Sequence, residues 1–421
     1  MQTESKRSDF ISGHYRGLPN LTANERRSSK IAWLVAGGEG YGVASTTLRM
    51  LAELKKRGWD TPVVSLSHGS LVTRCENQGH TVLVLNVGKV KVLRGGLFDR
   101  ALDFISNLRF QRKASGAVIS ALREIQPDAV HVRIPTFVGL AGRAAKAIGC
   151  RVFWQMPNCI SNSYPLGINR WIYHWLCLRY GITVVANSHF TARTFGTFPV
   201  TPEVMHLGVD AVRFDPNAVK AVSRAELGIP DDAIVFGVVA SLNSVKGQDR
   251  VLDAILRLGN TQPPLHLLLV GGPNDSEYAL GLVRRAEAAG AAHRLHMVGF
   301  TNGPERYYGV MDVAINSRIG PEPFGLSAVE AMFMATPVLV HALGGPAETV
   351  IDGETGWHIH GMSVERIVAA LRRVLQDRER WEEMGRNARR HAMNGFTAAQ
   401  EIDRYLNIIR ARCRATVGAV P

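Results

Sequence analysis

Short apolar runs alternate with amphipathic segments through the first half of the chain. The run Ile31–Val35 leads directly into glycines, and residues 43–58 follow with helical spacing and end on a glycine. Further apolar runs of strand length occupy residues 61–67, 81–87, 128–132, 150–156 and 182–188, with helical spacing at 117–125 and 139–147. Regular alternation of this kind predicts an α/β fold with a doubly wound parallel sheet, here a first domain over residues 30–212.

The same alternation begins again in the second half. Strands are expected at residues 233–240, 265–270, 294–300, 312–315 and 337–343, and final helices near 363–376 and 397–412. The pattern predicts a second domain over residues 213–396, a crossover near 209–216 and a C-terminal segment 397–421. Residues 1–29 are polar and lack periodicity, which predicts a mobile tail.

The stretch 316–330, NSRIGPEPFGLSAVE, is the strongest candidate for a binding site. It follows an apolar strand and contains a loop with glycine and prolines, then an amphipathic helix. Helix N-termini at the carboxyl edge of a parallel sheet present unpaired amides to anions. The backbone near Phe324, Gly325 and Leu326 therefore suits a phosphate.

Two carboxylates bracket the start of this helix. Glu322 lies in the loop, where it can face a ligand, and Glu330 lies two turns along the helix. A carboxylate is well matched to the paired hydroxyls of a ribose. Either glutamate alone would be an ordinary surface charge, but their joint spacing around Pro-Phe-Gly favours a nucleotide site.

These glutamates, eight residues apart, form an E-x7-E pattern. The segment EPFGLSAVEAM resembles glycosyltransferase family 4, whose members are retaining enzymes of the GT-B architecture. The downstream segment PVLVHALGGPAETVIDGETGW is also similar to this family, and the similarity extends over about residues 30–410. The resemblance implies two Rossmann-like doubly wound domains that face each other across a cleft, with residues 397–421 crossing back onto the first.

The resemblance also implies a reaction and roles for single side chains. The chain would move a sugar from a nucleotide-diphosphate sugar, its co-substrate, to a glycan or lipid-linked acceptor with retention of configuration. Glu322 would contact the sugar hydroxyls as the catalytic residue, Glu330 would hold the ribose, and Lys246 would neutralise the diphosphate. The arginine usual five residues before this lysine is replaced by Ser241, so Arg318 is a candidate for the second cation.

Two further groups of residues are assigned to the donor. Gly272, Val298 and Gly299 follow strands whose ends surround the nucleotide base in similar proteins. Gly38 and Gly40 lie after the first strand and permit close approach of a donor phosphate to backbone amides. The glycine fingerprint of dinucleotide-binding proteins is not formed, because a valine stands where its third glycine belongs.

Two histidine positions of the family are altered. Where relatives commonly carry a histidine after the strand at 150–156, this chain has QMPN at residues 155–158. His131 is present, but Arg133 replaces a second histidine. We therefore interpret His131 as a packed residue at a strand end rather than a catalytic one.

Composition narrows the class of protein. A chain of 421 residues is too long for a single typical domain core and fits two domains. No run of about 18 uncharged apolar residues and no apolar signal core occurs, so we expect a cytoplasmic protein. The five cysteines are scattered without C-x2-C pairing, which argues against a disulfide framework or a zinc site. No D-x-D triplet occurs, so we expect a metal-free reaction that needs no cofactor.

The net charge of +13 favours anionic partners. Nucleotide diphosphates, anionic lipid and nucleic acid all fit the charge, but the chain has no RNA-binding or helix-turn-helix signature, so nucleic acid is not expected. Residues 87–113 are basic with Leu, Phe and Ile interleaved. This segment is either a surface helix on the sheet or a patch that touches an anionic membrane surface from its inner face.

Three other classes of protein share some of these features. A nicotinamide dehydrogenase also has paired Rossmann-like domains, but its glycine fingerprint is not formed here. A nucleotide-sugar epimerase would have the same architecture without an acceptor. A non-catalytic module that binds sugar nucleotides remains open because the expected arginine and histidine are replaced. The pattern as a whole favours a glycosyltransferase of polysaccharide or glycolipid synthesis.

Overall fold

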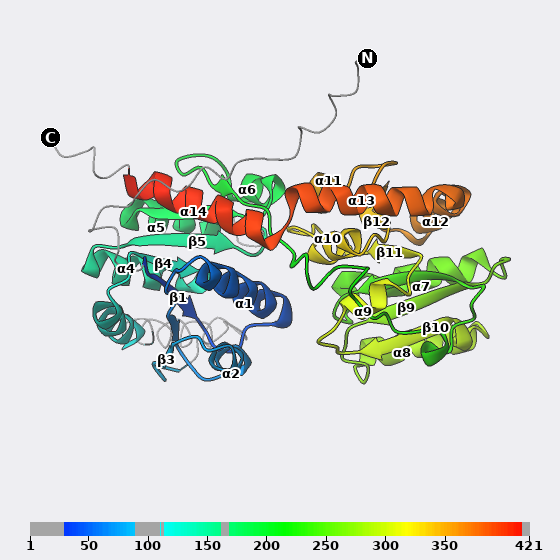
Figure 1. The fold of residues 1–421 in the computed structure, drawn as a ribbon, viewed down its shortest axis with the longest axis horizontal. Helices are drawn as coiled ribbons and strands as arrows, with labels where there is room; N and C mark the ends of the chain where they lie inside the picture. Colours follow the sequence, from blue (N-terminus) through cyan, green and yellow to red (C-terminus); the bar gives the residue numbers. More distant parts are fainter. Residues whose placement is uncertain (1–28, 89–109, 111–112, 161–167, 415–421) are drawn as a thin grey trace, which may run out of the picture.

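The structure, a computed structural model, describes residues 29–88, 110, 113–160 and 168–414 (Figure 1). Within them the chain forms two parallel sheets, one from residues 31–204 and one from residues 234–359. The predicted α/β class with two parallel sheets is therefore confirmed. The tail predicted for residues 1–28 and the basic positions 89–109, 111 and 112 lie outside the described residues.

The first sheet has seven strands in the order β3-β2-β1-β4-β5-β6-β7. Each neighbouring pair is parallel. The order reverses between β1 and β4, and a crevice at such a switch point is where open parallel sheets bind ligands. The strands are β1 (Ile31–Val35), β2 (Val63–Ser65), β3 (Val82–Val84), β4 (Ala129–Val132), β5 (Arg151–Met156), β6 (Ile182–Ala186) and β7 (Glu203–Val204).

Helices cover both faces of this sheet, which explains why its strands read as continuous apolar runs. In β1, Ile31 and Trp33 pack in one apolar cluster, whereas Ala32 and Leu34 pack in the cluster on the opposite face. The helices of this half are α1 (Tyr41–Lys56), α2 (Ser70–Asn77), α4 (Val138–Ile148), α5 (Ile168–Tyr180) and α6 (His189–Phe195). Residues 113–125 are also helical.

The second sheet has six parallel strands in the order β10-β9-β8-β11-β12-β13. They are β8 (Ile234–Val239), β9 (Leu265–Val270), β10 (Leu295–Gly299), β11 (Val313–Asn316), β12 (Val338–His341) and β13 (Gly356–Ile359). Its helices are α7 (Gln248–Leu258), α8 (Glu277–Ala288), α9 (Glu305–Tyr308), α10 (Leu326–Phe333), α11 (Pro346–Thr349), α12 (Val364–Gln376) and α13 (Trp381–Gly395). The sequence reading did not separate α13 from its neighbours.

The chain crosses between the two halves twice, and the two crossing segments pair with each other. The amide of Val209 donates to the carbonyl of Phe396 at 2.8 Å, and the amide of Ala398 donates to the carbonyl of Val209 at 2.8 Å. A Cβ at Gly208 would lie 2.5 Å from the carbonyl oxygen of Thr397. The close approach of the two segments therefore requires a glycine.

The last helix, α14 (Ala398–Arg414), runs back over the first half and packs on α1 (Figure 1). Tyr405 and Ile409 share an apolar cluster with Leu51 of α1. Arg49 of α1 and Glu401 of α14 form a largely buried ion pair at 2.7 Å. The exact domain boundaries remain a prediction. Among the described residues, no helix is both long and apolar enough to cross a membrane.

Candidate active site

A cavity of about 820 Å³ lies between the two halves. Its first-half wall comes from α1, α2 and the glycines before α1, and its second-half wall from the ends of β8, β9 and β11 and the start of α10. Six of the residues singled out in the sequence line it: Gly40, Lys246, Glu322, Gly325, Leu326 and Glu330. The other six candidates lie outside this lining.

Lys246 and Glu322 meet at the second-half wall. The ammonium Nζ of Lys246 lies 3.0 Å from Oε2 of Glu322, and both side chains are mostly buried. The Nε of Arg318 lies 4.0 Å from the same oxygen and has no hydrogen-bond partner among the described residues. Two cations therefore converge on one carboxylate, and Arg318 stands where it could share a diphosphate with Lys246.

The loop that carries Lys246 is fastened to the end of β11. The carbonyl of Lys246 accepts from Oγ of Ser317 at 2.7 Å, and the amide of Ile319 donates to Val245 at 3.0 Å. Gly247 has a φ of +70°, and a Cβ there would lie 2.4 Å from the carbonyl of Ser317. The Lys-Gly pair in the sequence therefore reflects close backbone contact as well as charge.

The loop that carries Glu322 is fastened to the end of β12. The amide of Glu322 donates to Leu343 at 3.0 Å, and its carbonyl accepts from the amide of Gly345 at 2.8 Å. Gly344 has a φ of +114°, and a Cβ there would lie 2.1 Å from the carbonyl oxygen of Glu322. The glycine pair after β12 thus fixes the backbone of this glutamate.

Helix α10 begins at Leu326, as the sequence predicts, and Gly325 precedes it with a φ of +87°. No side chain caps its first turn, and Gly325, Leu326 and Ser327 line the cavity. Uncapped amides at a helix start favour an anion. Phe324 does not line the cavity, because its ring is buried against Phe396.

Glu330 lies on α10 and lines the same wall. Its Oε2 accepts a hydrogen bond from the hydroxyl of Tyr308 at 3.0 Å. Burial raises the pKa of Glu330 to about 7, although Tyr308 and the nearby Arg213 act in the opposite direction. Arg213 itself forms an ion pair with Glu305 at 2.8 Å.

The residues assigned to the nucleotide base lie beside the cavity rather than on its surface. Gly272, Val298 and Gly299 are absent from the lining, whereas Gly271 is part of it. The amide of Gly271 donates to the carbonyl of Gly299 at 2.9 Å, so the latter supports the wall. The sequence reading missed Phe300, which lines the cavity with 72% of its surface exposed. An aromatic residue directly after a strand-end glycine was the available signal.

The glycine loop after β1 differs from the expected phosphate-binding loop. The carboxylate of Glu39 accepts from the amides of Ala36 at 2.6 Å and Gly37 at 3.0 Å. Gly40 lines the cavity, but Gly38 does not. Glu39 therefore occupies the amides of Ala36 and Gly37, and the assignment of Gly38 and Gly40 to the donor stays a prediction.

His131 and Arg133 support the first-half wall from behind. His131 is 1% exposed, stacks on Trp33 with ring centroids 3.8 Å apart, and places Nδ1 2.6 Å from the hydroxyl of Tyr405. Arg133 is buried beneath α1 and donates to the carbonyl of Val43 at 3.1 Å. Burial lowers the pKa of Arg133 to about 10. Both side chains hold helices in place, and neither lines the cavity.

A second contact joins the halves next to the Glu322 loop. The carbonyl of Pro323 accepts from Oγ of Ser188 at 2.6 Å and from Oγ1 of Thr191 at 3.2 Å. The carboxylate of Glu348 accepts from the amides of His189 at 2.8 Å and Phe190 at 2.6 Å. The start of α6 therefore holds the second half through both a loop carbonyl and a carboxylate.

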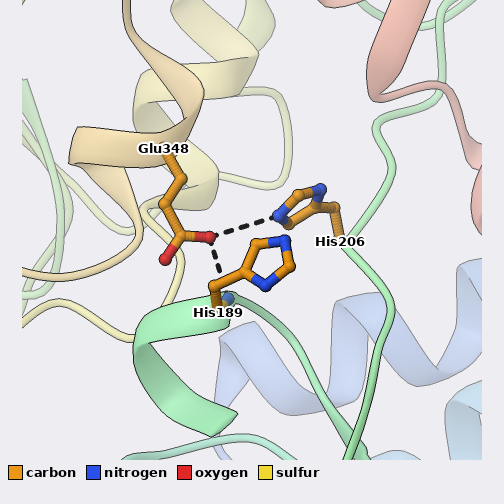
Figure 2. Close-up of side chains that lie close together, drawn as sticks. All are labelled: His189, His206 and Glu348. Atoms are coloured by element: carbon orange, nitrogen blue, oxygen red, sulfur yellow. Dashed lines mark hydrogen bonds and ion pairs between the residues drawn. The ribbon is translucent and has the colours of Figure 1, made fainter. Parts of the chain in front are cut away.

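Figure 2 shows that Glu348 also meets His206, whose Nε2 lies 3.3 Å from Oε2 of Glu348. Burial alone would raise the pKa of Glu348, but hydrogen bonds from His206 and the two amides lower it. Potential ligand atoms of His189, His206 and Glu348 lie within 4.8 Å of one another, a grouping that their sequence positions did not indicate. Both carboxylate oxygens are already used to join the halves, so we assign no metal here.

Comparison with protein families matches both halves of the chain. Residues 41–213 match the model described as Glycosyltransferase Family 4, and residues 219–391 match the model of Glycosyl transferases group 1. The five residues between the two matched ranges, 214–218, lie in and just after the first crossing segment, and the second range includes Lys246, Glu322 and Glu330.

Curated relatives include D-inositol 3-phosphate glycosyltransferases. The protein of this name from Kineococcus radiotolerans is 32% identical over 247 residues, which cover 54% of this chain and 56% of the relative. That from Mycobacterium bovis is 35% identical over 204 residues, which cover 47% of this chain and 41% of the relative. The chain thus spans about half the length of the curated relatives it matches.

Solved structures show the same fold at low sequence identity. A glycosyltransferase from Rickettsia africae has a TM-score of 0.77 at 19% identity, covering 92% of this chain and 99% of that one. Anabaena HepE, solved in complex with UDP-glucose, has a TM-score of 0.74 at 20% identity, covering 91% and 99%. With both family models matched in order along a GT-B fold, the chain belongs to the group 1 glycosyltransferases of the family 4 type.

Proposed function

We propose that this protein is a retaining, metal-independent glycosyltransferase that moves a sugar from a nucleotide-diphosphate sugar to a glycan or lipid-linked acceptor. The observation that carries the proposal is the second-half wall of the cavity. There a paired lysine and glutamate, an uncapped helix start and a second glutamate face one space. Arg318 lies just behind this lining, with its Nε 4.0 Å from Oε2 of Glu322. Each of these groups suits one part of such a donor.

The reaction breaks the bond between the sugar carbon and the departing phosphate oxygen, and both electrons leave with the phosphate. An acceptor hydroxyl oxygen forms the new bond to the same sugar carbon, and its proton passes to the departing diphosphate. Groups placed where this negative charge grows lower the barrier. Lys246, Arg318 and the amides at the start of α10 are suited to that task. Because Lys246 is paired with Glu322 in the structure, a diphosphate would take over the cation and leave the carboxylate to contact the sugar hydroxyls.

The nucleoside part of the donor fits farther along the same wall. A carboxylate accepts well from the two ribose hydroxyls, and Glu330 lies about one turn from the phosphate end of α10. The exposed ring of Phe300 offers a flat apolar surface for a base. UDP-glucose is bound by the similar Anabaena structure, so a uridine donor is the first to try here.

The first-half wall would receive the acceptor in the cytoplasm. It carries the basic side chains Arg49, Lys56 and Arg74 on α1 and α2. Such a wall suits an acceptor with anionic groups, including a lipid-linked diphosphate. We propose no metal because Lys246 and Arg318 already supply positive charge at the expected diphosphate position.

The test begins with thermal shift and calorimetry of the purified chain against UDP, GDP, ADP and their sugars in the presence of EDTA. We expect one nucleoside diphosphate to raise the melting temperature, and its sugar form to be slowly hydrolysed. Transfer to an added acceptor with retained configuration, followed by NMR of the product, would complete the assignment. Binding without hydrolysis or transfer would favour a non-catalytic sugar-nucleotide module, and conversion of the donor to its epimer would favour an epimerase.

A further inference from the structure

Helix α5 exposes a continuous apolar stripe. Five large apolar side chains at helical spacing have between 49% and 60% of their surface exposed: Ile168, Trp171, Ile172, Trp175 and Leu178. Their positions i, i+3, i+4, i+7 and i+10 place them on one face of the helix. Two of them are tryptophans, which are large and seldom left in water without a partner.

The opposite face of α5 already serves the core of the first half. Tyr173 packs against Trp154 with ring centroids 4.9 Å apart, and Cys177 is buried. Leu176 lies over Gly139 of α4. A helix that is apolar on all sides is normally covered on all sides. Within the part of the chain that the structure describes, the five apolar side chains on the outer face of α5 are therefore about half exposed and have little cover.

One more aromatic side chain extends the stripe. Phe198, in the loop after α6, is 80% exposed. This loop adjoins α5, because Nε2 of His174 lies 3.0 Å from the carbonyl of Phe195 and Gly196 lies beside Arg170. We name Ile168, Trp171, Ile172, Trp175, Leu178 and Phe198 the α5 surface.

The stretch of chain that forms α5 and the neighbouring helices α4 and α6 contains basic but no acidic side chains. None of the 36 acidic residues of the chain lies between Ala129 and Pro202, the stretch that contains α4, α5 and α6. Basic side chains are interspersed in it, and the exposed ones include Arg143, Lys146, Arg179 and Arg193. An apolar stripe with tryptophans and flanking arginines combines the two attractions that hold a helix at the surface of an anionic bilayer.

We propose that the α5 surface docks the protein onto an anionic lipid bilayer. Trp171 and Trp175 would enter the headgroup region together with the aliphatic side chains between them, while the arginines would meet lipid phosphates. A second copy of the chain fits less well, because a symmetric contact would place this basic surface against itself. Docking requires no catalytic step and stands apart from the proposed transfer, although it would bring the cavity to a lipid-linked acceptor.

Vesicle flotation tests the proposal with the full chain. We expect the wild-type protein to float with vesicles that contain phosphatidylcholine and phosphatidylglycerol. With vesicles of phosphatidylcholine alone, it should remain in the bottom fraction. The double substitution Trp171→Ser with Trp175→Ser should reduce the bound fraction by roughly tenfold or more, because two interfacial aromatics are lost. Arg179→Gln with Arg193→Gln should weaken binding less and make it less sensitive to salt.

Two controls make the result specific. Leu280→Ser removes an exposed apolar side chain of α8, in the other half of the chain, and should leave flotation unchanged. A variant with Lys89, Arg94, Arg109 and Arg112 changed to Glu tests the basic segment instead. Circular dichroism and the thermal shift with nucleoside diphosphate establish that each variant is folded, so failure of docking is distinguishable from failure of donor binding.

The proposal is overturned if the tryptophan variant floats like the wild type, if only the basic-segment variant loses binding, or if both vesicle types bind equally. It is also overturned if the wild-type chain binds no vesicle. A dimer in light scattering that the tryptophan variant converts to a monomer would instead assign the α5 surface to self-association.

Discussion

The two walls of the cavity are built in different ways. On the second-half wall, Lys246 and Glu322 stand on loops that are fastened to the neighbouring strand ends by backbone hydrogen bonds and obligatory glycines. On the first-half wall, α1 is held from behind by buried Arg133 and by an ion pair from Arg49 to the distant Glu401. The second-half wall is thus fixed by short, local loops, and the first-half wall by contacts between residues far apart in the sequence.

The difference bears on what each wall can recognise. Carboxylate and cationic groups held in fixed positions suit the sugar and diphosphate of the proposed donor, because these two parts of the donor are the same whichever acceptor is used. A helix face with long basic side chains leaves the acceptor chemistry open to variation. Changes to the second-half wall should therefore affect the chemical step and donor binding, whereas matched changes to the first-half wall should spare both.

The largest effect is expected for Glu322→Gln. Loss of the carboxylate should lower the turnover number by roughly 10²–10³-fold or more, because a group that acts at the reacting sugar is removed. Binding of the nucleoside diphosphate should become tighter, since Lys246 loses the carboxylate that it now contacts at 3.0 Å. Product formation and calorimetry measure the two effects separately.

The exposed Glu354→Gln is the control for this change, and it should behave like the wild type in both assays. An unchanged turnover number in the Glu322 variant would show that Glu322 takes no part in the chemical step.

The next effect is expected for Lys246→Ala. Binding of the nucleoside diphosphate should weaken by about 1.5–3 kcal/mol, whereas binding of the free nucleoside should hardly change, because one charge-assisted contact to phosphate is lost. Calorimetry with both ligands measures the difference. Lys56→Ala is the matched control from the first-half wall, where the lysine pairs with Glu53 at 2.6 Å. An equal loss for both lysines would contradict the comparison of the walls.

A single methyl group should disturb the second-half wall. In Gly344→Ala the new Cβ would lie 2.1 Å from the carbonyl of Glu322, at a φ of +114°. We expect a loss of about 1–3 kcal/mol in the free energy of unfolding and a lower turnover number, because the loop of Glu322 must move. Denaturant unfolding and a rate assay test both effects.

Gly320→Ala is the control in the same loop. A Cβ there meets nothing within 4 Å, and the substitution should change stability by less than about 0.5 kcal/mol. Similar losses in the two variants would mean that the glycine pair does not hold Glu322.

The smallest effect concerns the pH dependence of stability. Burial raises the pKa of Glu330 from 4.5 to about 7, so the folded chain holds a proton that the unfolded chain has lost. The free energy of unfolding should therefore fall as the pH rises from about 4.5 to 7. In Glu330→Gln this fall should be smaller by about 1–2 kcal/mol, after allowance for partial exposure.

Urea unfolding at pH 5 and pH 8 measures the difference between Glu330→Gln and the wild type. The variant should be the more stable protein at pH 8 and about equal at pH 5. An unchanged pH dependence would show that the carboxyl group ionises freely in the folded state.

Much of the fold could be read from local patterns. The apolar run 265–270 forms β9, because a strand that is buried on both faces is apolar along its whole length. The helix expected at Leu326 begins there, because a glycine precedes its apolar positions of helical spacing. Helix α13 was missed because residues 377–396 were assigned no element, although Asn394-Gly395 marks a turn before α14. Glu322 was singled out because it stands in a strand-loop-helix unit, and Lys246 because its Lys-Gly pair resembles the family.

Other features depend on contacts that no local pattern reveals. The glycines after β1 look like an anion loop, yet Glu39 accepts from two amides at its start, those of Ala36 and Gly37. Ser188 donates to the carbonyl of Pro323 and the amide of His189 donates to Glu348, across 135 and 159 positions of the chain. Phe300 was passed over, because the exposure of an aromatic residue after a strand depends on what packs above it.

The sequence by itself determined the α/β class and the two sheets, because periodic burial and short loops are local properties, and the resemblance to a family pointed to Lys246, Glu322 and Glu330 of the second-half wall. Only the tertiary structure decided which cations meet Glu322, that Phe300 lines the cavity, and that five large apolar side chains of α5 are exposed. These outcomes depend on how segments that are far apart in the sequence pack together. That packing depends on the shape and charge of both segments, so the residue pattern of one segment alone does not reveal it.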